Sequence, residues 1–239
     1  MIAEAAIVKG KLLAHARTPL YGNGYALVIS SGVSSALGLA YWALAARLYS
    51  ADAVGFNAAT ISAMMFLAGF AQLNLMSALM RFIPEAGRQA ARFILITYAV
   101  STAVAAVASA VFGRSIGAFV PTLSAIGASP VLMVWFAAAT VAWCVFVLED
   151  SAITGLRRAT WVPISNIGFS IAKIVLLIVL AATFPQYGVF ASWTFALAAC
   201  VVLTNVVLFA RLLPRQTRDM PGDHSQLSVK TISRFVFTD

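Results

Sequence analysis

Six long apolar runs divide this chain, and they constrain its fold more than any other feature of the sequence. A helix needs roughly 17 to 25 residues to cross the hydrocarbon core of a bilayer, and each run reaches that length. In lipid, a helix satisfies its backbone hydrogen bonds within one segment. We therefore predict an all-α integral membrane protein with six transmembrane helices, at residues 24–46, 53–80, 93–112, 131–148, 162–183 and 188–210.

The composition agrees with this class of protein. Of the 239 residues, 62% are hydrophobic and 10% are charged, whereas a soluble domain contains about 25% charged residues. The net charge of +8 comes from small clusters between the apolar runs, and no basic stripe is interleaved with aromatic residues. We therefore expect no nucleic acid as a partner.

The distribution of basic residues predicts the orientation in the membrane. If the N-terminus is cytoplasmic, 13 of the 16 lysines and arginines lie in cytoplasmic segments, Arg47 and Arg114 lie outside, and Lys173 lies within the membrane. Short loops rich in lysine and arginine stay in the cytoplasm, so both termini are expected there. The predicted parts are a cytoplasmic N-terminal segment, a six-helix lobe and a cytoplasmic tail, at residues 1–23, 24–210 and 211–239.

The fifth run contains a lysine near its middle. Asn166, Ser170 and Lys173 are spaced at i, i+4 and i+7, which places them on one helix face. A lysine at that depth costs about 2.5 to 3.5 kcal/mol on insertion scales. Snorkelling to the interface, or a buried partner such as Glu149, would be simpler explanations. From mid-span the interface is about 15 Å away, beyond the reach of a lysine, and we therefore favour a cation that lines a cavity.

Polar faces in the first two runs extend this hypothesis. Ser34 belongs to a small and polar face of the first run, and Gln72 belongs to a similar face of the second. Such faces are typical either of close helix packing or of a wet cavity. Arg47, at the external end of the first run, could attract an anion or could serve only the topology. The predicted substrate-binding residues are Lys173, Asn166, Ser170, Arg47, Gln72 and Ser34.

Catalytic and metal-binding motifs are missing from the sequence. The two histidines, His15 and His224, fall in the predicted tails, which excludes an HExxH site. Glu149 and Asp150 form the one adjacent carboxylate pair, at the cytoplasmic end of the fourth run. We interpret the pair as a solvated helix end rather than a metal or glycosyl-phosphate site. We predict no catalytic residue, no metal and no cofactor.

Two segments resemble the N-terminal half of bacterial polysaccharide flippases, the Wzx-like branch of the MOP superfamily that also contains MATE exporters and the lipid II flippase. The first is "ALGLAYWALAARLYSADAVGFNAATISAMMFLAGFAQLNLMSALMRFIPEAG", residues 36–87, and it is similar to the first two helices of that family. The second is "ISRFVFTD", residues 232–239, and it resembles the entry to the seventh helix. Family members have 12 to 14 spans, so the resemblance implies one lobe of such a transporter. A second lobe or partner chain is expected to complete it.

The resemblance also implies a function. It implies transport of an undecaprenyl-diphosphate-linked oligosaccharide across the bacterial cytoplasmic (inner) membrane, for lipopolysaccharide or another surface polysaccharide, without covalent chemistry. The expected partners are this lipid-linked oligosaccharide and the membrane lipids. A cationic cavity between the two lobes would accept the diphosphate, and an ammonium at Lys173 agrees with that role because its attraction to an anion is stronger in a low dielectric.

Three other functions remain open from the sequence. A MATE-like exporter of small cations would be expected to carry carboxylates in its spans, and none of the predicted span cores contains one. A membrane glycosyltransferase or polysaccharide polymerase would be expected to have a large external loop with catalytic residues. The longest predicted external segment, residues 113–130, has Arg114 as its one charged residue. A non-transporting membrane scaffold also agrees with the length of a single lobe.

Overall fold

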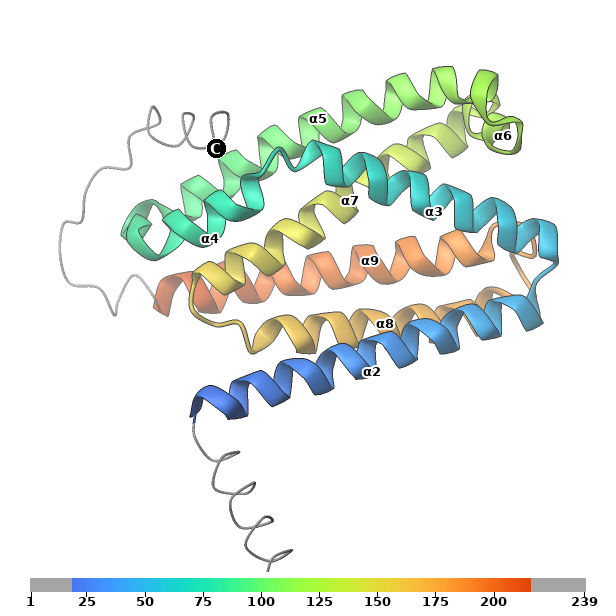
Figure 1. Cartoon of the computed structure of the whole chain (residues 1–239). Coiled ribbons are helices and arrows are strands. Elements are labelled where there is room, and N and C mark those ends of the chain that lie inside the picture. Colours follow the sequence, from blue (N-terminus) through green and yellow to red (C-terminus); the bar gives the residue numbers. More distant parts are fainter. Residues whose placement is uncertain (1–18, 216–239) are drawn as a thin grey trace, which may run out of the picture.

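The protein is a bundle of antiparallel helices (Figure 1). The computed structural model describes residues 19–215, and this part of the chain is helical without a strand. Consecutive long helices run in opposite directions, and their connections lie at the two ends of the bundle. The helices are α2 (Pro19–Leu48), α3 (Ala51–Ala71), α4 (Leu75–Ala86), α5 (Ala90–Phe119), α6 (Ser124–Ala128), α7 (Pro130–Gly155), α8 (Trp161–Leu180) and α9 (Gly188–Val207), with short helical segments at Gly87–Gln89, Pro121–Leu123 and Leu208–Leu212.

Five helices in the described part are long and apolar enough to cross a membrane. They lie at Ala51–Ala71, Ala90–Gly117, Pro130–Gly155, Trp161–Leu180 and Gly188–Arg215. The predicted class, a multi-pass all-α membrane protein, is therefore confirmed. The first predicted span, residues 24–46, falls within the 30-residue helix α2, but α2 is not one of these five helices. A sixth membrane span, formed by α2, therefore stays a prediction.

The second predicted span is wrong as a single helix. The structure divides residues 53–80 between α3 and α4, and Leu73 and Asn74 connect them with φ angles of 45° and 60°. The apolar face of α4 packs against α7. Gly155 permits this close approach, because a Cβ there would lie 2.9 Å from the carbonyl oxygen of Leu79. A separate short helix can turn its apolar face onto α7, and this packing explains the break.

The fourth predicted span ends too early. Helix α7 does not stop at Leu148 but continues to Gly155, so Glu149 and Asp150 lie inside a helix. Glu149 is 0% exposed. The carboxylate pair is therefore not a solvated helix end, and the expectation that no carboxylate lies within a span is also wrong. The neighbouring helices α4 and α9 pack against α7 and help to cover this turn.

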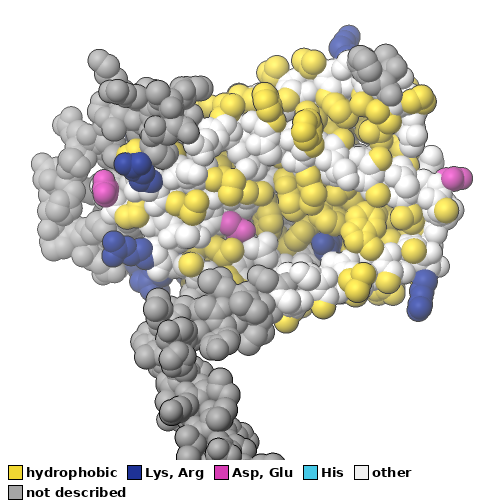
Figure 2. Space-filling view, viewed as in Figure 1, with side chains coloured by type: hydrophobic (Ala, Val, Ile, Leu, Met, Phe, Trp, Pro, Cys, Tyr) yellow, Lys and Arg dark blue, Asp and Glu magenta, His cyan; other side chains and the backbone are white. Residues whose placement is uncertain are grey.

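The interior has two apolar clusters, and the outer surface is apolar as well. One cluster centres on aromatic residues such as Tyr41 and Trp193, and the other on aliphatic residues where α4 packs against α5 and α7. On the outside, Leu39, Phe66 and Val131 are 74%, 72% and 75% exposed. Yellow side chains accordingly cover the middle of the bundle in Figure 2. A surface of this kind is suited to contact with lipid.

The two ends of the bundle differ in the number of arginines that they carry. Figure 2 shows Lys and Arg side chains mainly at the ends, although dark-blue and magenta atoms also reach the surface in the apolar middle. Within residues 19–215, Arg47 and Arg114 lie at one end, here named the Arg-poor end. The opposite Arg-rich end carries Arg81, Arg88, Arg92, Arg157, Arg158, Arg211 and Arg215. The alternation of helices brings together the arginines that the sequence assigns to one side.

Candidate functional site

Lys173 lies inside the bundle against three aromatic rings. Its side chain, on α8, is 6% exposed. The ammonium nitrogen lies 3.9 Å from the ring centre of Trp193, 4.9 Å from that of Phe169 and 5.0 Å from that of Tyr41. The rings come from α9, α8 and α2, and we name the three residues the aromatic cage. Ring faces attract cations through their negative quadrupole.

Local structure holds the cage in place. Phe169 lies four residues before Lys173, so both side chains project from one face of α8. The Tyr41 hydroxyl donates a hydrogen bond of 2.8 Å to the carbonyl oxygen of Val189 and lies 3.0 Å from the Ser192 hydroxyl. The ring of Trp193 packs edge-on against those of Tyr41 and Phe169, at centroid distances of 5.5 and 5.6 Å. The rings are therefore positioned by contacts that do not involve the ammonium.

The ammonium of Lys173 keeps its positive charge uncompensated. Within residues 19–215, Lys173 has no hydrogen bond or ion pair. Glu149, the partner considered from the sequence, instead accepts a hydrogen bond from Asn205. Snorkelling does not describe the side chain either, because its nitrogen lies against the rings of the cage. Aromatic faces stabilise a cation without neutralising it, so a protonated Lys173 has no counter-charge among the described residues of the bundle.

Asn166 and Ser170 share the face of Lys173 but contact other groups. The Asn166 amide donates hydrogen bonds of 2.9 Å to Asp150 Oδ2 and 3.0 Å to the carbonyl oxygen of Val162. The Ser170 hydroxyl donates to the carbonyl oxygen of Asn166 at 2.9 Å. Asn166 lies seven residues from Lys173, or about 10 Å along the helix. Asn166 thus connects α8 to the Asp150 carboxylate of α7.

The other three predicted binding residues are spread along the bundle. Ser34 is half-buried on α2, about 10 Å closer to the Arg-rich end than Tyr41. Gln72 is 8% exposed at the break after α3, and the 12-residue helix α4, about 18 Å long, separates it from the Arg-rich end. Arg47 is exposed in the last turn of α2, at the Arg-poor end. The six predicted residues therefore occupy different depths, and the structure does not gather them around Lys173.

The sequence analysis missed a polar cluster near the Arg-rich end of the bundle. We name it the carboxylate cluster, and it consists of Glu149, Asp150, Asn166, Asn205 and Tyr98. The Asn205 amide donates to Glu149 Oε1, and Tyr98 is close enough to interact electrostatically with both carboxylates. The sequence signals for this cluster were two polar residues within apolar runs: Asn205 near the end of the sixth run and Tyr98 in the third. Neither could be linked to Glu149 without knowing how the helices pack.

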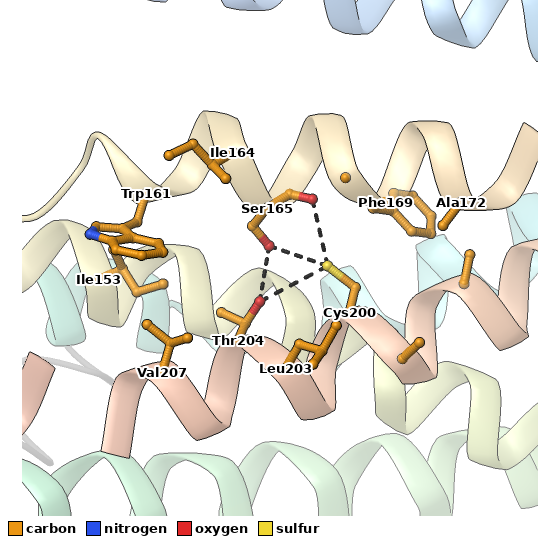
Figure 3. A pocket seen from close by; sticks show the side chains of 13 residues that line it. Ile153, Trp161, Ile164, Ser165, Phe169, Ala172, Cys200, Leu203, Thr204 and Val207 are labelled. Carbon is orange, nitrogen blue, oxygen red and sulfur yellow. Dashed lines mark hydrogen bonds between the residues drawn. The ribbon is translucent and has the colours of Figure 1, made fainter. Parts of the chain in front are cut away.

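A groove between α8 and α9 opens on the outside of the bundle (Figure 3). It has a volume of about 280 Å³, and most of the residues that line it are apolar. In its floor, the Ser165 hydroxyl lies 3.0 Å from that of Thr204 and 3.3 Å from the Cys200 sulfur. No acidic or basic residue lines this groove. It is suited to an acyl or isoprenyl chain rather than to a charged head group.

A second cleft, of about 770 Å³, lies at the Arg-poor end between the α2–α3 turn, the segment before α7 and the α8–α9 turn. It contains the carboxylate of Asp52, the amide of Gln186 and the hydroxyl of Thr122. The rings of Phe56 and Tyr187 also line it and pack edge to face, with centroids 5.8 Å apart. Rings beside hydrogen-bonding groups are a suitable surface for a polar head group at the membrane interface.

Within residues 19–215, no group of three or more His, Cys, Asp or Glu side chains could hold a metal ion.

Comparison of the chain with protein-family models, with curated proteins and with solved structures gave no match.

Proposed function

We propose that the chain is one lobe of a transporter of the polysaccharide-flippase type. Its substrate would be an undecaprenyl-diphosphate-linked oligosaccharide that crosses the bacterial cytoplasmic membrane. The observation that supports this proposal is the uncompensated ammonium of Lys173 in the middle of a membrane helix. A charged residue at that depth is expensive and usually marks a substrate or ion pathway. A diphosphate is the anion that the resemblance to flippases implies.

The aromatic cage is compatible with such a role because it holds the ammonium weakly. Cation–π contacts are worth about 0.5 to 2 kcal/mol. Hydrogen bonds to a charged group are worth about 1.5 to 3 kcal/mol. The lysine can therefore leave the rings for a diphosphate at little cost. In the absence of the anion, the cage prevents the ammonium from lying unsatisfied in an apolar interior.

The α8–α9 groove and the Arg-poor cleft fit the other two parts of the substrate. The apolar walls of the groove could accept the isoprenoid chain at the lipid-facing surface. The cleft beside Asp52, Gln186 and Tyr187 could accept sugars at the interface. Movement of the head group across the membrane requires alternating access between two lobes. This chain would supply one of them.

Binding of an isoprenyl diphosphate to the purified chain tests the proposal. Trp193 contacts Lys173, so tryptophan fluorescence can report occupancy. We expect Lys173→Met to weaken binding by roughly ten- to a hundredfold, which corresponds to the 1.5 to 3 kcal/mol of a charge-assisted hydrogen bond. Lys173→Arg should keep part of the affinity. Arg114→Met, which removes an exposed arginine at the Arg-poor end, is the matched control and should bind like the parent.

The same variants can be compared in cells that carry the gene in its natural context. At matched expression, Lys173→Met should lower surface polysaccharide, while Lys173→Arg retains part of it. Equal diphosphate binding and equal polysaccharide export by the parent and Lys173→Met would contradict the proposal. A lysine with a purely structural role predicts that result, since removal of a buried charge without a ligand often improves stability.

One observation favours a second candidate, a MATE-like exporter of cationic small molecules. The sequence analysis argued against it because the predicted spans contained no carboxylate, yet Glu149 is buried within α7 and Asp150 is next to it. Binding of a lipophilic cation that depends on Glu149 would support the exporter. The two candidates differ in the sign of the ligand and in the residue that binds it, and the same fluorescence titration separates them.

A further inference from the structure

The α8–α9 groove changes its chemistry with depth in the membrane (Figure 3). Trp161 of α8 and Val207 of α9 lie at its outer end, which is directed toward the Arg-rich end of the bundle. One turn further in, the hydroxyls of Ser165 and Thr204 lie 3.0 Å apart. Most of the lining from there to Ala172 is apolar. The groove is therefore polar near its outer end and apolar toward the middle of the bundle.

The groove is as deep as one leaflet of a bilayer. On α8 its lining runs from Trp161 to Ala172, or about 16 Å along the helix. Half of a hydrocarbon core measures about 15 Å. Trp161 is 37% exposed, and tryptophan is typical of the membrane interface. The groove thus extends from one interface to about the middle of the membrane, a depth that suits one acyl chain of a phospholipid.

Small residues leave the inner part of the groove open to lipid. Gly168 of α8 and Ala199 of α9 line it, and both are exposed. A Cβ at Gly168 would meet no atom within 4 Å, so helix packing does not require a glycine there. Small residues in membrane helices usually allow two helices to approach closely. These two instead leave a hollow at the surface, which an alkyl chain can fill.

Two arginines lie just beyond the outer end of the groove. The N–H of Arg158 donates to the carbonyl oxygen of Ile153 at 3.1 Å, and the carbonyl oxygen of Arg158 accepts from the N–H of Trp161 at 3.0 Å. Ile153 and Trp161 both line the groove, so Arg158 is fixed beside it. Arg211 follows Val207 by four residues, which places it one turn further out on the same side of the helix.

Neither arginine has a counter-charge nearby. Within residues 19–215, the side chains of Arg158 and Arg211 make no hydrogen bond or ion pair, and both residues are exposed. No acidic residue occurs at 153–165 or 203–215, the two segments that border the outer end. The positive-inside rule accounts for basic residues at this end of the bundle, but it does not place them beside an apolar groove. Their charge is available to an anionic head group.

We propose that the α8–α9 groove binds one molecule of an anionic phospholipid, phosphatidylglycerol. Its phosphate lies between Arg158 and Arg211, and one of its acyl chains follows the apolar part of the groove. Its ester carbonyls lie beside the hydroxyls of Ser165 and Thr204. Because one of these hydroxyls donates to the other, the second keeps a proton that can reach an ester carbonyl. The parts of the lipid thus follow one another in the same order as the groups of the groove.

Other lipids match this arrangement less well. The cationic head group of phosphatidylcholine would meet two arginines and no carboxylate. An isoprenyl diphosphate could enter between the apolar walls, but it has no ester carbonyl for the hydroxyls of Ser165 and Thr204. An undecaprenyl chain is also several times longer than the groove. The phospholipid site is therefore distinct from the diphosphate site proposed at Lys173 and does not depend on it.

Quenching of tryptophan fluorescence by brominated lipids tests this site. The purified full chain in detergent would be titrated with phosphatidylglycerol and, separately, with phosphatidylcholine that carries the same brominated acyl chains. We expect saturable quenching at a roughly ten- to thirtyfold lower concentration of phosphatidylglycerol, because each arginine contributes about fivefold to the binding of an anionic lipid. Trp161→Phe should remove most of the saturable quenching, since Trp161 is the tryptophan that lines the groove.

Two changes separate the head group from the acyl chain. Arg158→Gln combined with Arg211→Gln should remove the preference for phosphatidylglycerol. Ala199→Leu should weaken saturable quenching by at least about tenfold, because the larger side chain occupies the space of the acyl chain. Ala199→Leu leaves both arginines in place, so it tests the site even if the double arginine variant does not fold.

Matched controls come from other parts of the bundle. Arg92→Gln removes an exposed arginine at the same Arg-rich end, on α5, which packs mainly against α3 and α7. Ala103→Leu fills the apolar surface between α3 and α5 instead. Both variants should bind phosphatidylglycerol like the parent. Lys173→Met should also keep the preference, so a failure of the proposed transport function would leave this inference standing.

Three results would overturn the inference. The first is equal quenching of the parent by phosphatidylglycerol and phosphatidylcholine. The second is an equal loss of preference in Arg92→Gln and in the double arginine variant, because the attraction would then belong to the whole Arg-rich end. The third is displacement of phosphatidylglycerol by a lower concentration of an isoprenyl diphosphate, since this would assign the groove to the transported lipid.

Discussion

The ammonium of Lys173 lies 3.9 Å from the ring centre of Trp193. This contact joins α8 to α9 in the middle of the bundle, within one of the two apolar clusters of the interior. The contact satisfies a buried cation without a counter-ion among the described residues.

We expect Lys173 and Trp193 to be energetically coupled. Trp193→Leu removes the nearest ring of the cage, and Lys173→Met removes the charge that the ring stabilises. A double-mutant cycle of thermal or denaturant unfolding should give a coupling of about 1 kcal/mol. The control pair is Lys173 with Trp135, a tryptophan of α7 that stacks on Phe195 and lies outside the cage. Additive effects in both pairs would show that the cage contributes nothing to stability.

Gly188→Ala should destabilise the protein by about 1 to 3 kcal/mol, because the new methyl group would overlap with a fixed tyrosine. A Cβ at Gly188 would lie 2.6 Å from Cε1 and 2.8 Å from Cζ of Tyr49. The Tyr49 hydroxyl donates a hydrogen bond of 2.8 Å to the carbonyl oxygen of Leu177, so the ring cannot move without losing it. A tyrosine hydroxyl is already protonated at neutral pH, and burial raises the pKa of Tyr49 further.

The control for Gly188→Ala is Gly168→Ala on α8, where a Cβ would meet nothing within 4 Å. We expect this change to be neutral or to stabilise the helix slightly. Tyr49→Ala should relieve part of the loss in the Gly188→Ala background. Unfolding of the three variants and the parent in one detergent is the measurement. Equal stability of the two glycine variants would refute the steric explanation.

Arg157→Gly should stabilise the protein by about 1 kcal/mol. Arg157 follows α7 with a φ of 57°, a left-handed conformation that favours glycine. Its N–H donates to the carbonyl oxygen of Thr154, and that of Arg158 donates to Ile153, the two hydrogen bonds of a Schellman motif. Arg158→Gly removes the same charge without this backbone benefit and should not raise the Tm. A Tm increase in Arg158→Gly as large as in Arg157→Gly would contradict the argument.

Both termini are predicted to be cytoplasmic. Reporter fusions at Ala51 and Gln186, at the Arg-poor end, should be external. Fusions at Gly87 and Ala159, at the Arg-rich end, should be internal. The corresponding internal fusion at Gly222 lies outside the described residues. If the protein inserts but one of these fusions is found on the opposite side, the predicted topology is wrong: either a pair of spans is absent or the orientation is inverted.

The helices themselves could largely be predicted from the sequence. Apolar runs of bilayer length locate both ends of α8 and α9 and the starts of α5 and α7 to within three residues, because transfer into lipid depends on local composition. The C-terminal ends of α5 and α7 lie seven residues beyond the predicted spans. The break at Leu73 and Asn74 could not be predicted in this way. No proline or glycine marks it, and its cause is the packing of the distant residues around Gly155 against α4.

The candidate sites were predictable in part. A lysine in mid-span is visible in the sequence, and the helical period places Asn166 and Ser170 on its face. The partners of these residues come from other helices. Tyr41 of α2 and Trp193 of α9 meet at Lys173, although they are far apart in the chain. Periodicity describes one helix at a time, and it cannot say which face of a second helix lies opposite.

The sequence by itself determined the membrane class, most helix positions and the grouping of arginines at the two ends, since these depend on local composition and on the alternation of helices. Only the tertiary structure decided what the charged residues within the spans contact. Lys173 lies on aromatic rings, while Glu149 and Asp150 lie beside the amides of Asn205 and Asn166. The physical reason is that desolvation and pairing depend on contacts between helices, which the order of residues in one span does not contain.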